Sequence, residues 1–228
     1  MRGRLFVGAV VLFAATALVA RPVLSQDKAK PPEPPKKVED HPKKGADPAK
    51  GPDAEKGNAA KMAEMEAWMK AGTTGEHHAH LKPLVGSWKC ATKWWQDPKE
   101  SAQESTGTME RKMIMGDRFL QEEYKGTMMD MPFTGMGFCG YDNLKKKYVS
   151  TWMDSMSTMI MTMTGTCDGA GKSFTFTGEH ECPITGKMQK MRTVLRIESP
   201  DKHVMEMYGP DPDGKEFRNF EMICTRVK

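Results

Sequence analysis

Side chains that alternate with a period of two constrain this chain more than any other feature. Methionine and threonine alternate through residues 159–166, and phenylalanine and threonine alternate through residues 173–180. Successive side chains of a β-strand point to opposite faces, so this alternation predicts half-buried antiparallel strands. From Leu81 onward the same period recurs in about ten segments.

The turns between these segments favour a closed barrel. Each segment ends in residues that favour turns, and no helix long enough to cover a sheet is indicated after Leu81. A meander of this size leaves its hydrogen-bonding edges exposed unless it closes on itself. We therefore predict an all-β fold, a single antiparallel up-and-down barrel of about ten strands and lipocalin-like form, over residues 81–228.

The N-terminus has the pattern of an export signal. Arg2 and Arg4 precede an apolar run from Leu5 to Ala20, and small residues follow around Ser25. The run is roughly 16 residues long, whereas a membrane-spanning helix needs about 20. Residues 1–25 are predicted to be a signal peptide cleaved after Ser25, with retention as an anchor as the alternative. The mature protein is then expected to be extracytoplasmic, periplasmic or secreted, and to meet the membrane only through this peptide before cleavage.

Two further segments precede the barrel. Residues 26–58 are rich in Lys, Pro, Glu, Asp, Ala and Gly and contain no aromatic residue. They cannot bury enough apolar surface to offset the entropy of ordering them, which predicts a disordered linker. Residues 59–72 are predicted to form a short amphipathic helix that packs against the barrel, because large apolar residues recur there at helical spacing. These residues are Met62, Met65, Trp68 and Met69.

Both ends of the barrel segment carry residues typical of small barrels. Gly86-Ser87-Trp88 stands near its start, and Arg226 stands near its end. The chain resembles lipocalin-like and fatty-acid-binding-protein-like barrels in this respect, in which an indole closes the barrel floor and a basic side chain packs on it. The resemblance implies structural roles for Trp88 and Arg226.

A set of longer motifs covers nearly the whole barrel segment. They are Leu84-Val85-Gly86-Ser87-Trp88, Gly116-Asp117-Arg118-Phe119-Leu120, Tyr141-Asp142-Asn143, Asp154-Ser155-Met156-Ser157 and Asp213-Gly214-Lys215-Glu216-Phe217. In these motifs the chain is similar to the domain of unknown function 1579 family, which is regarded as lipocalin-like and has no assigned activity. The resemblance implies the fold and leaves the chemistry open.

Strand register leads to a predicted disulfide. If the first and last strands are antiparallel neighbours and Trp88 faces Arg226, then Cys90 lies opposite Cys224. Opposed cysteines on adjacent strands approach the separation that a disulfide needs, and such bonds persist in exported proteins. A bond between Cys90 and Cys224 is therefore predicted under this register, and the remaining cysteines are left unassigned.

Methionine is abundant, with 21 residues in the chain. Met161 and Met163 share one face of a predicted strand, as do Met205 and Met207. Thioether sulfur selects Cu(I), but methionine also fills irregular apolar space and lines adaptable pockets. We favour core or pocket lining here, and Cu(I) binding is the alternative.

Histidine offers two other candidate sites. His180 continues the face set by Phe174 and Phe176, so it is expected to point into the barrel near its rim. There it would bind a ligand, ligate haem iron or make a structural hydrogen bond. The three histidines of residues 77–80 would bind a metal ion or lie in a solvated loop.

A few polar side chains are expected inside the otherwise apolar barrel, where they would orient a ligand such as a carboxylate or a phenol. The alternative is a structural ion pair among Arg111, Glu122 and Asp154. The predicted ligand-binding residues are Arg111, Tyr124, Trp152, Asp154, Met161, Met163, Phe176 and His180.

These features favour a non-enzymatic barrel that binds a small apolar or amphipathic molecule. No catalytic residue is predicted, because metalloprotease, phosphate-binding and nucleophile-elbow motifs are missing. The alternatives are Cu(I) or haem binding, a structural envelope domain, and an enzyme that acts through Glu122, Asp154 and His180. A net charge of only +4 without a basic, aromatic-interleaved stripe argues against nucleic-acid binding.

Overall fold

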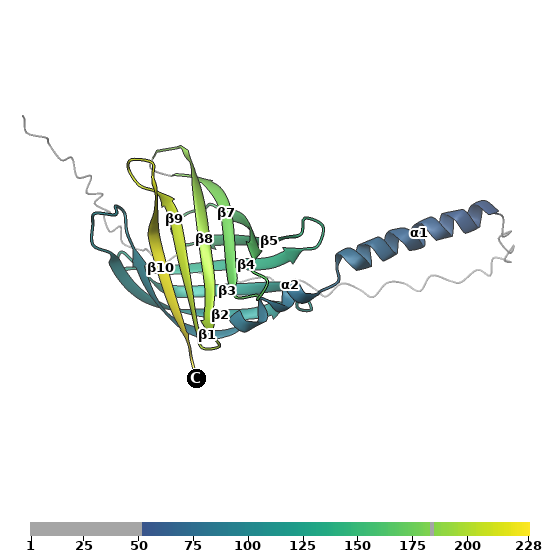
Figure 1. Ribbon diagram of the computed structural model, residues 1–228, viewed down its shortest axis with the longest axis horizontal. Coiled ribbons are helices and arrows are strands. Elements are labelled where there is room, and N and C mark those ends of the chain that lie inside the picture. The colour runs from purple at the N-terminus through teal and green to yellow at the C-terminus, as the bar shows by residue number, and fades with distance from the viewer. Residues whose placement is uncertain (1–51, 183–184) are drawn as a thin grey trace, which may run out of the picture. The chain divides into compact units, whose positions relative to one another are not determined.

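The computed structural model describes residues 52–182 and 185–228. Within these ranges, ten antiparallel strands close into one barrel in which strands consecutive in sequence are neighbours and β1 pairs with β10 (Figure 1). The predicted all-β, up-and-down barrel is confirmed. The strands are β1 (Gly86–Trp94), β2 (Gln103–Ile114), β3 (Phe119–Met128), β4 (Met131–Asp142), β5 (Lys147–Asp154), β6 (Met161–Cys167), β7 (Ser173–Glu181), β8 (Met188–Ser199), β9 (Lys202–Pro210) and β10 (Glu216–Arg226).

Three short helical elements precede β1. They are α1 (Pro52–Ala71), α2 (Glu76–Ala79) and the 3-10 helix η1 (Lys82–Leu84). Helix α1 starts earlier than the predicted Ala59, within the segment assigned to the linker. Proline suits the first helical position because the N–H that it lacks has no partner there. The predicted signal peptide and residues 26–51 lie outside the described residues.

The apolar face of α1 is uncovered. Its four large side chains, Met62, Met65, Trp68 and Met69, are 62% to 73% exposed. The packing predicted for this face is therefore wrong in this structure. Among the described residues, no helix is both long and apolar enough to cross a membrane.

Helices α2 and η1 cover one end of the barrel, which we call the floor; the opposite end, where β1 leads to β2, is the mouth (Figure 1). Leu81 and Leu84 are buried at the floor. The indole Nε1 of Trp88 donates to the Leu84 carbonyl at 2.9 Å, and the Tyr148 hydroxyl donates to the His77 carbonyl at 2.9 Å. These bonds tie the N-terminal helices to the barrel wall.

The first and last strands are joined covalently. Trp88 pairs with Arg226 and Cys90 with Cys224, and the two cysteines form a disulfide. The Arg226 guanidinium stacks 4.1 Å from the Trp88 ring centre and donates to the carbonyls of Val85 and Pro83 at 2.7 and 2.9 Å. The structure thus contains the register, the stacked pair and the disulfide that the sequence predicted.

In the part of the chain that the structure describes, the inward side chains of the strands form two clusters of buried residues. One lies toward the floor and includes Leu84, Tyr148 and Phe174. The other surrounds Trp88 and includes Tyr124 and Met222. The outward positions of the same strands carry polar side chains, as on β6, where the threonines are exposed. The period of two is what sorts the side chains between the two faces.

Candidate functional site

Five of the predicted ligand-binding residues lie together at the mouth. Tyr124 on β3 and Asp154 on β5 both pair with Gly135 of β4. Trp152 on β5 pairs with Met161 on β6. Met163 pairs with Gly178, and the same register places Met161 beside His180 of β7. We call these five residues, Tyr124, Trp152, Asp154, Met161 and His180, the mouth site.

Two glycines of β4 make room for the indole of Trp152. A Cβ at Gly135 would collide with the Trp152 ring, and one at Gly137 would come within 3.0 Å of both that ring and a Glu122 carboxylate oxygen. The indole therefore lies against the β4 backbone. Its Nε1 donates to Asp154 Oδ2 at 3.0 Å, which holds the ring and the carboxylate in one orientation.

A cavity of about 410 Å³ opens at the mouth ends of β3, β4 and β5. Tyr124, Gly135 and Asp154 line it together with outward residues such as Met136 and Met153. Burial raises the pKa of the Tyr124 phenol above its usual range, so the hydroxyl stays neutral. The volume lies within the range of pockets that hold small ligands, about 300–1,000 Å³.

His180 adds an unsatisfied polar atom to the mouth site. Within the described residues its Nδ1 is buried and has no hydrogen-bond partner. Buried polar groups are nearly always hydrogen-bonded, so an orphan of this kind calls for a ligand or an ordered water molecule. Among the mouth-site residues, His180 is therefore the one with a buried side-chain nitrogen that has no partner in the described part of the chain.

Arg111 lies elsewhere, in a buried polar cluster with Glu122 and His203. The Arg111 Nε donates to Glu122 Oε2 at 2.8 Å, and its Nη1 contacts His203 Nε2. The side chain of Arg111 is 3% exposed and that of Glu122 is 16% exposed. Because Glu122 neutralises it, Arg111 offers no free charge to a ligand. The ion pair that the sequence left as a structural alternative is present, without Asp154.

His203 is a buried neutral imidazole. Burial, with the neighbouring guanidinium groups of Arg111 and Arg226, lowers its pKa to about 2. Since Nε2 accepts from Arg111, the proton lies on Nδ1. That Nδ1 is buried and, in the described part of the chain, has no partner. The ring also packs edge-on against Trp88, with ring centres 4.4 Å apart.

His203 was missed by sequence reasoning. Met205 and Met207 were assigned to one strand face, and extending that alternation by two residues reaches His203. Met163 and Phe176, in contrast, were predicted as ligand contacts. They are buried below the mouth, 8% and 6% exposed, within the floor cluster.

The three histidines near the N-terminal end of the barrel pack against tyrosines. His77 stacks on Tyr141 with ring centres 4.1 Å apart, and His80 Nδ1 lies 3.0 Å from the Tyr148 hydroxyl. His78 is buried, which lowers its pKa. Across the described residues, no group of three or more His, Cys, Asp or Glu side chains could hold a metal ion.

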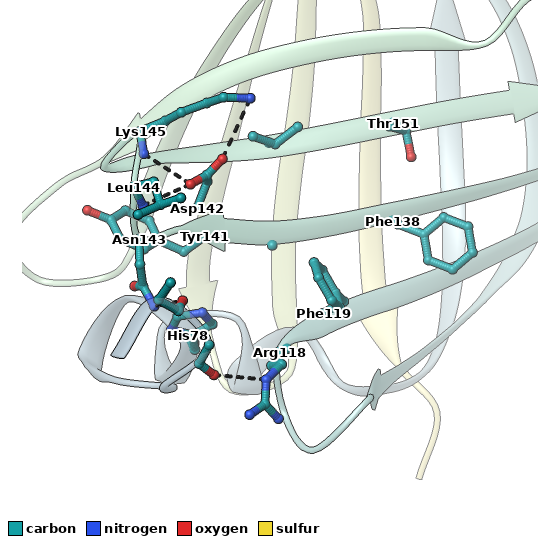
Figure 2. A pocket seen from close by; sticks show the side chains of 14 residues that line it. His78, Arg118, Phe119, Phe138, Tyr141, Asp142, Asn143, Leu144, Lys145 and Thr151 are labelled. Atoms are coloured by element: carbon teal, nitrogen blue, oxygen red, sulfur yellow. Dashed lines mark hydrogen bonds and ion pairs between the residues drawn. The ribbon is translucent and has the colours of Figure 1, made fainter. Parts of the chain in front are cut away.

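A second cavity, of about 420 Å³, lies on the outer surface beside the end of α1 (Figure 2). We call it the outer groove. Outward side chains of β3, β4 and β5 line it, among them Phe119, Phe138 and Thr151. Arg118 Nε donates to the Gly72 carbonyl at 2.9 Å at one edge. Figure 2 shows Lys145 at a separate edge, close to Asp142.

Two of the residues named for the enzyme alternative, Glu122 and Asp154, already bond to other groups of the barrel. Glu122 is held by Arg111, and Asp154 accepts hydrogen bonds from Trp152 Nε1 and, at 2.9 Å, from the Met156 N–H. Both carboxylates therefore already hold neighbouring groups of the barrel. A general acid or base needs a free proton position within hydrogen-bond reach of a reacting group.

Comparison with known proteins gives a family and a fold. The chain matches the model of a family described as "Protein of unknown function (DUF1579)" over residues 73–226. Rv2717c from M. tuberculosis shares the fold, with a TM-score of 0.53 and 14% sequence identity over 68% of this chain and 100% of that one. A redesigned beta barrel gives a TM-score of 0.34 and 17% identity over 65% of this chain and 96% of that one. No curated protein matches in sequence.

Proposed function

The chain belongs to the DUF1579 family of proteins of unknown function, and on that premise we propose that its barrel binds a small, largely apolar molecule at the mouth site. The buried, unpartnered Nδ1 of His180 is the observation that carries the proposal. Trp152, Met161 and the ring of Tyr124 supply apolar contacts around it. We further propose that binding takes place outside the cytoplasm, on the strength of the export signal in residues 1–25.

The polar groups of the mouth site favour a ligand with a hydroxyl over one with a carboxylate. Asp154 is an acceptor, and an ionised carboxylate has capacity beyond the two hydrogen bonds that it already accepts. A ligand carboxylate would be repelled by Asp154. Arg111, the basic residue predicted to receive such a group, is already paired with Glu122. A phenol or alcohol meets Asp154 and His180 without this repulsion.

Two naphthalene probes of the same size test this preference. 1-Naphthol is expected to bind the purified protein, as followed by its fluorescence, and 1-naphthoate is expected to bind more weakly. His180→Ala should weaken 1-naphthol binding by about 2- to 10-fold, the value of one hydrogen bond. His77→Ala, a histidine at the other end of the barrel, is the matched control. Equal affinity in His180→Ala and the unaltered protein would overturn the assignment of His180.

Native mass spectrometry of the protein purified from its source gives an independent readout. A mass excess that corresponds to a small organic molecule, and that is lost in Trp152→Ala, is expected. If the protein carries no such mass excess and binds neither naphthalene probe, the proposal as a whole is wrong.

The β6–β7 register, extended by two residues, places His180 beside Met161, and this favours a second candidate, a haem or Cu(I) site. Imidazole and thioether together ligate haem iron in cytochromes c, and thioether sulfur selects Cu(I). Titration with haemin and with Cu(I) tests it. Loss of affinity in both His180→Ala and Met161→Leu is expected for such a site, and unchanged affinity in the two variants excludes these ligands.

A further inference from the structure

The apolar face of α1 and the outer groove are two uncovered surfaces of similar character. Along α1, Met62, Met65 and Met69 recur at spacings of three and four residues, so they share one helix face with Trp68. The Trp68 indole is 71% exposed. Aromatic side chains bury large areas when they are packed, so covering this ring would give a large favourable free energy. A helix of this length without tertiary contacts is also only marginally stable.

The outer groove has the lining that such a face requires. Phe119 is 40% exposed on the outside of the barrel, and Phe138 and Val149 lie beside it. The groove volume of about 420 Å³ is enough to receive large side chains such as an indole and a methionine. The outer face of β6, in contrast, carries exposed threonines.

The charges around the two surfaces are complementary. Glu64 precedes Met65 by one position and Glu66 follows it by one, so their side chains project about 100° to either side of Met65. Arg118 and Lys145 stand at separate edges of the outer groove (Figure 2). An α1 helix lying in the groove on its Met65 face would bring a carboxylate toward each basic edge.

The helix does not fill the groove of its own chain. The residues at its C-terminal end are held at the groove edge, since Asn143 Nδ2 donates to the Ala71 and Thr73 carbonyls at 2.8 Å and Arg118 donates to Gly72. With this attachment in place, Trp68 stays exposed although it lies only one turn before Ala71. The groove is thus available to a helix from elsewhere.

We propose that the outer groove of one copy receives α1 of a second copy, with Trp68 and Met65 seated against Phe119 and Phe138. Exchange of the helix in both directions gives a two-fold symmetric dimer in which each apolar face is covered once. No new segment or partner is required, because both surfaces belong to this chain.

Sedimentation equilibrium of the full chain tests the exchange. A dimer is expected for the unaltered protein, and Trp68→Glu is expected to raise the dimer dissociation constant by at least about 100-fold, since large aromatic residues dominate such interfaces. Ile160→Glu alters another exposed apolar residue, 64% exposed in the loop between β5 and β6, and this matched control should remain dimeric.

A second variant distinguishes docking of α1 in the outer groove from direct pairing of two α1 helices. Thr151→Arg places a large charged side chain in the groove without touching α1, and it is expected to give a monomer. Circular dichroism confirms that each variant keeps its barrel. A monomeric unaltered protein at all concentrations overturns the proposal, as does a dimer that survives Trp68→Glu. Dimers lost in Trp68→Glu but kept in Thr151→Arg would overturn the groove as the receiving surface.

Discussion

Glu122 has a larger energetic role than its modest burial suggests, because it neutralises the buried guanidinium of Arg111. Glu122→Leu removes the partner and leaves an uncompensated charge in the barrel, which is expected to lower the free energy of unfolding by about 3–5 kcal/mol. Urea unfolding followed by tryptophan fluorescence measures the loss.

The double variant Arg111→Met with Glu122→Leu should be less damaged than Glu122→Leu alone, since replacing a whole buried pair by apolar groups is often neutral. Glu104→Leu, which breaks the exposed Lys93–Glu104 pair, is the control and should change stability little. A double variant as unstable as the single one would contradict this account of Glu122.

The lowered pKa of His203 leads to a prediction of how the free energy of unfolding depends on pH. Its pKa is lowered from 6.5 to about 2 in the folded barrel, so the folded chain stays unprotonated where the unfolded chain binds a proton. Above pH 6.5 both states are unprotonated at His203, and the free energy of unfolding does not depend on this residue's titration. As the pH falls below that value, only the unfolded chain gains a proton, so the free energy of unfolding decreases by about 1.4 kcal/mol per pH unit. His78, whose pKa is also lowered by burial, acts in the same direction.

His203→Leu should flatten this dependence. Chemical unfolding at a series of pH values from 7 to 4.5 is expected to show a shallower fall in the free energy of unfolding for the variant, by up to about 1.4 kcal/mol per pH unit. An identical slope in the two proteins would mean that His203 binds a proton as readily in the native barrel as in the unfolded chain.

The sequence indicated which side chains point into the barrel but not what they meet there. Tyr124, Trp152 and His180 follow directly from the period of two. The partners depend on contacts between strands far apart in the chain. Arg111 meets Glu122 across the β2–β3 pair but meets His203 across the barrel interior, and no local pattern carries that second contact.

At the scale of the strands, the disulfide makes the β1–β10 seam unlike the other seams. Reduction, or the double variant Cys90→Ala with Cys224→Ala, is expected to destabilise the barrel by about 3–5 kcal/mol, since the bond closes a long loop. Thermal unfolding with and without a thiol reductant measures it. Addition of reductant to the double variant should have no further effect. Equal melting temperatures for the oxidised and reduced protein would rule out a bond that stabilises the seam.

The strands were more predictable than the helix. Burial alternates along strands such as β1, β6 and β7, and the β1–β10 register followed from matching Trp88 with Arg226. For α1, the lack of apolar residues before Ala59 was taken as a sign of disorder. Backbone hydrogen bonds and residue propensity also contribute to helix formation, and a search for apolar residues does not record them.

At the scale of the whole molecule, closure was predictable and cavity shape was not. An open meander of this many strands would expose two edges, so the number of strands itself favoured a barrel. The arrangement of the mouth site, in contrast, depends on where the Trp152 ring lies against β4. That position is set by Gly135 and Gly137, residues on a different strand. Glycine in a strand pattern is a sign of close approach, but it does not say which side chain approaches.

The pairing of β1 with β10 also has a kinetic consequence. Cys90 and Cys224 are 134 residues apart in the chain, so the contact that completes the barrel forms only after all the strands between them have been synthesised. Until then β1 carries an open hydrogen-bonding edge, which is where strands of different chains join in error. Contacts between distant residues slow folding. The time before the seam closes is therefore when this protein is most exposed to aggregation.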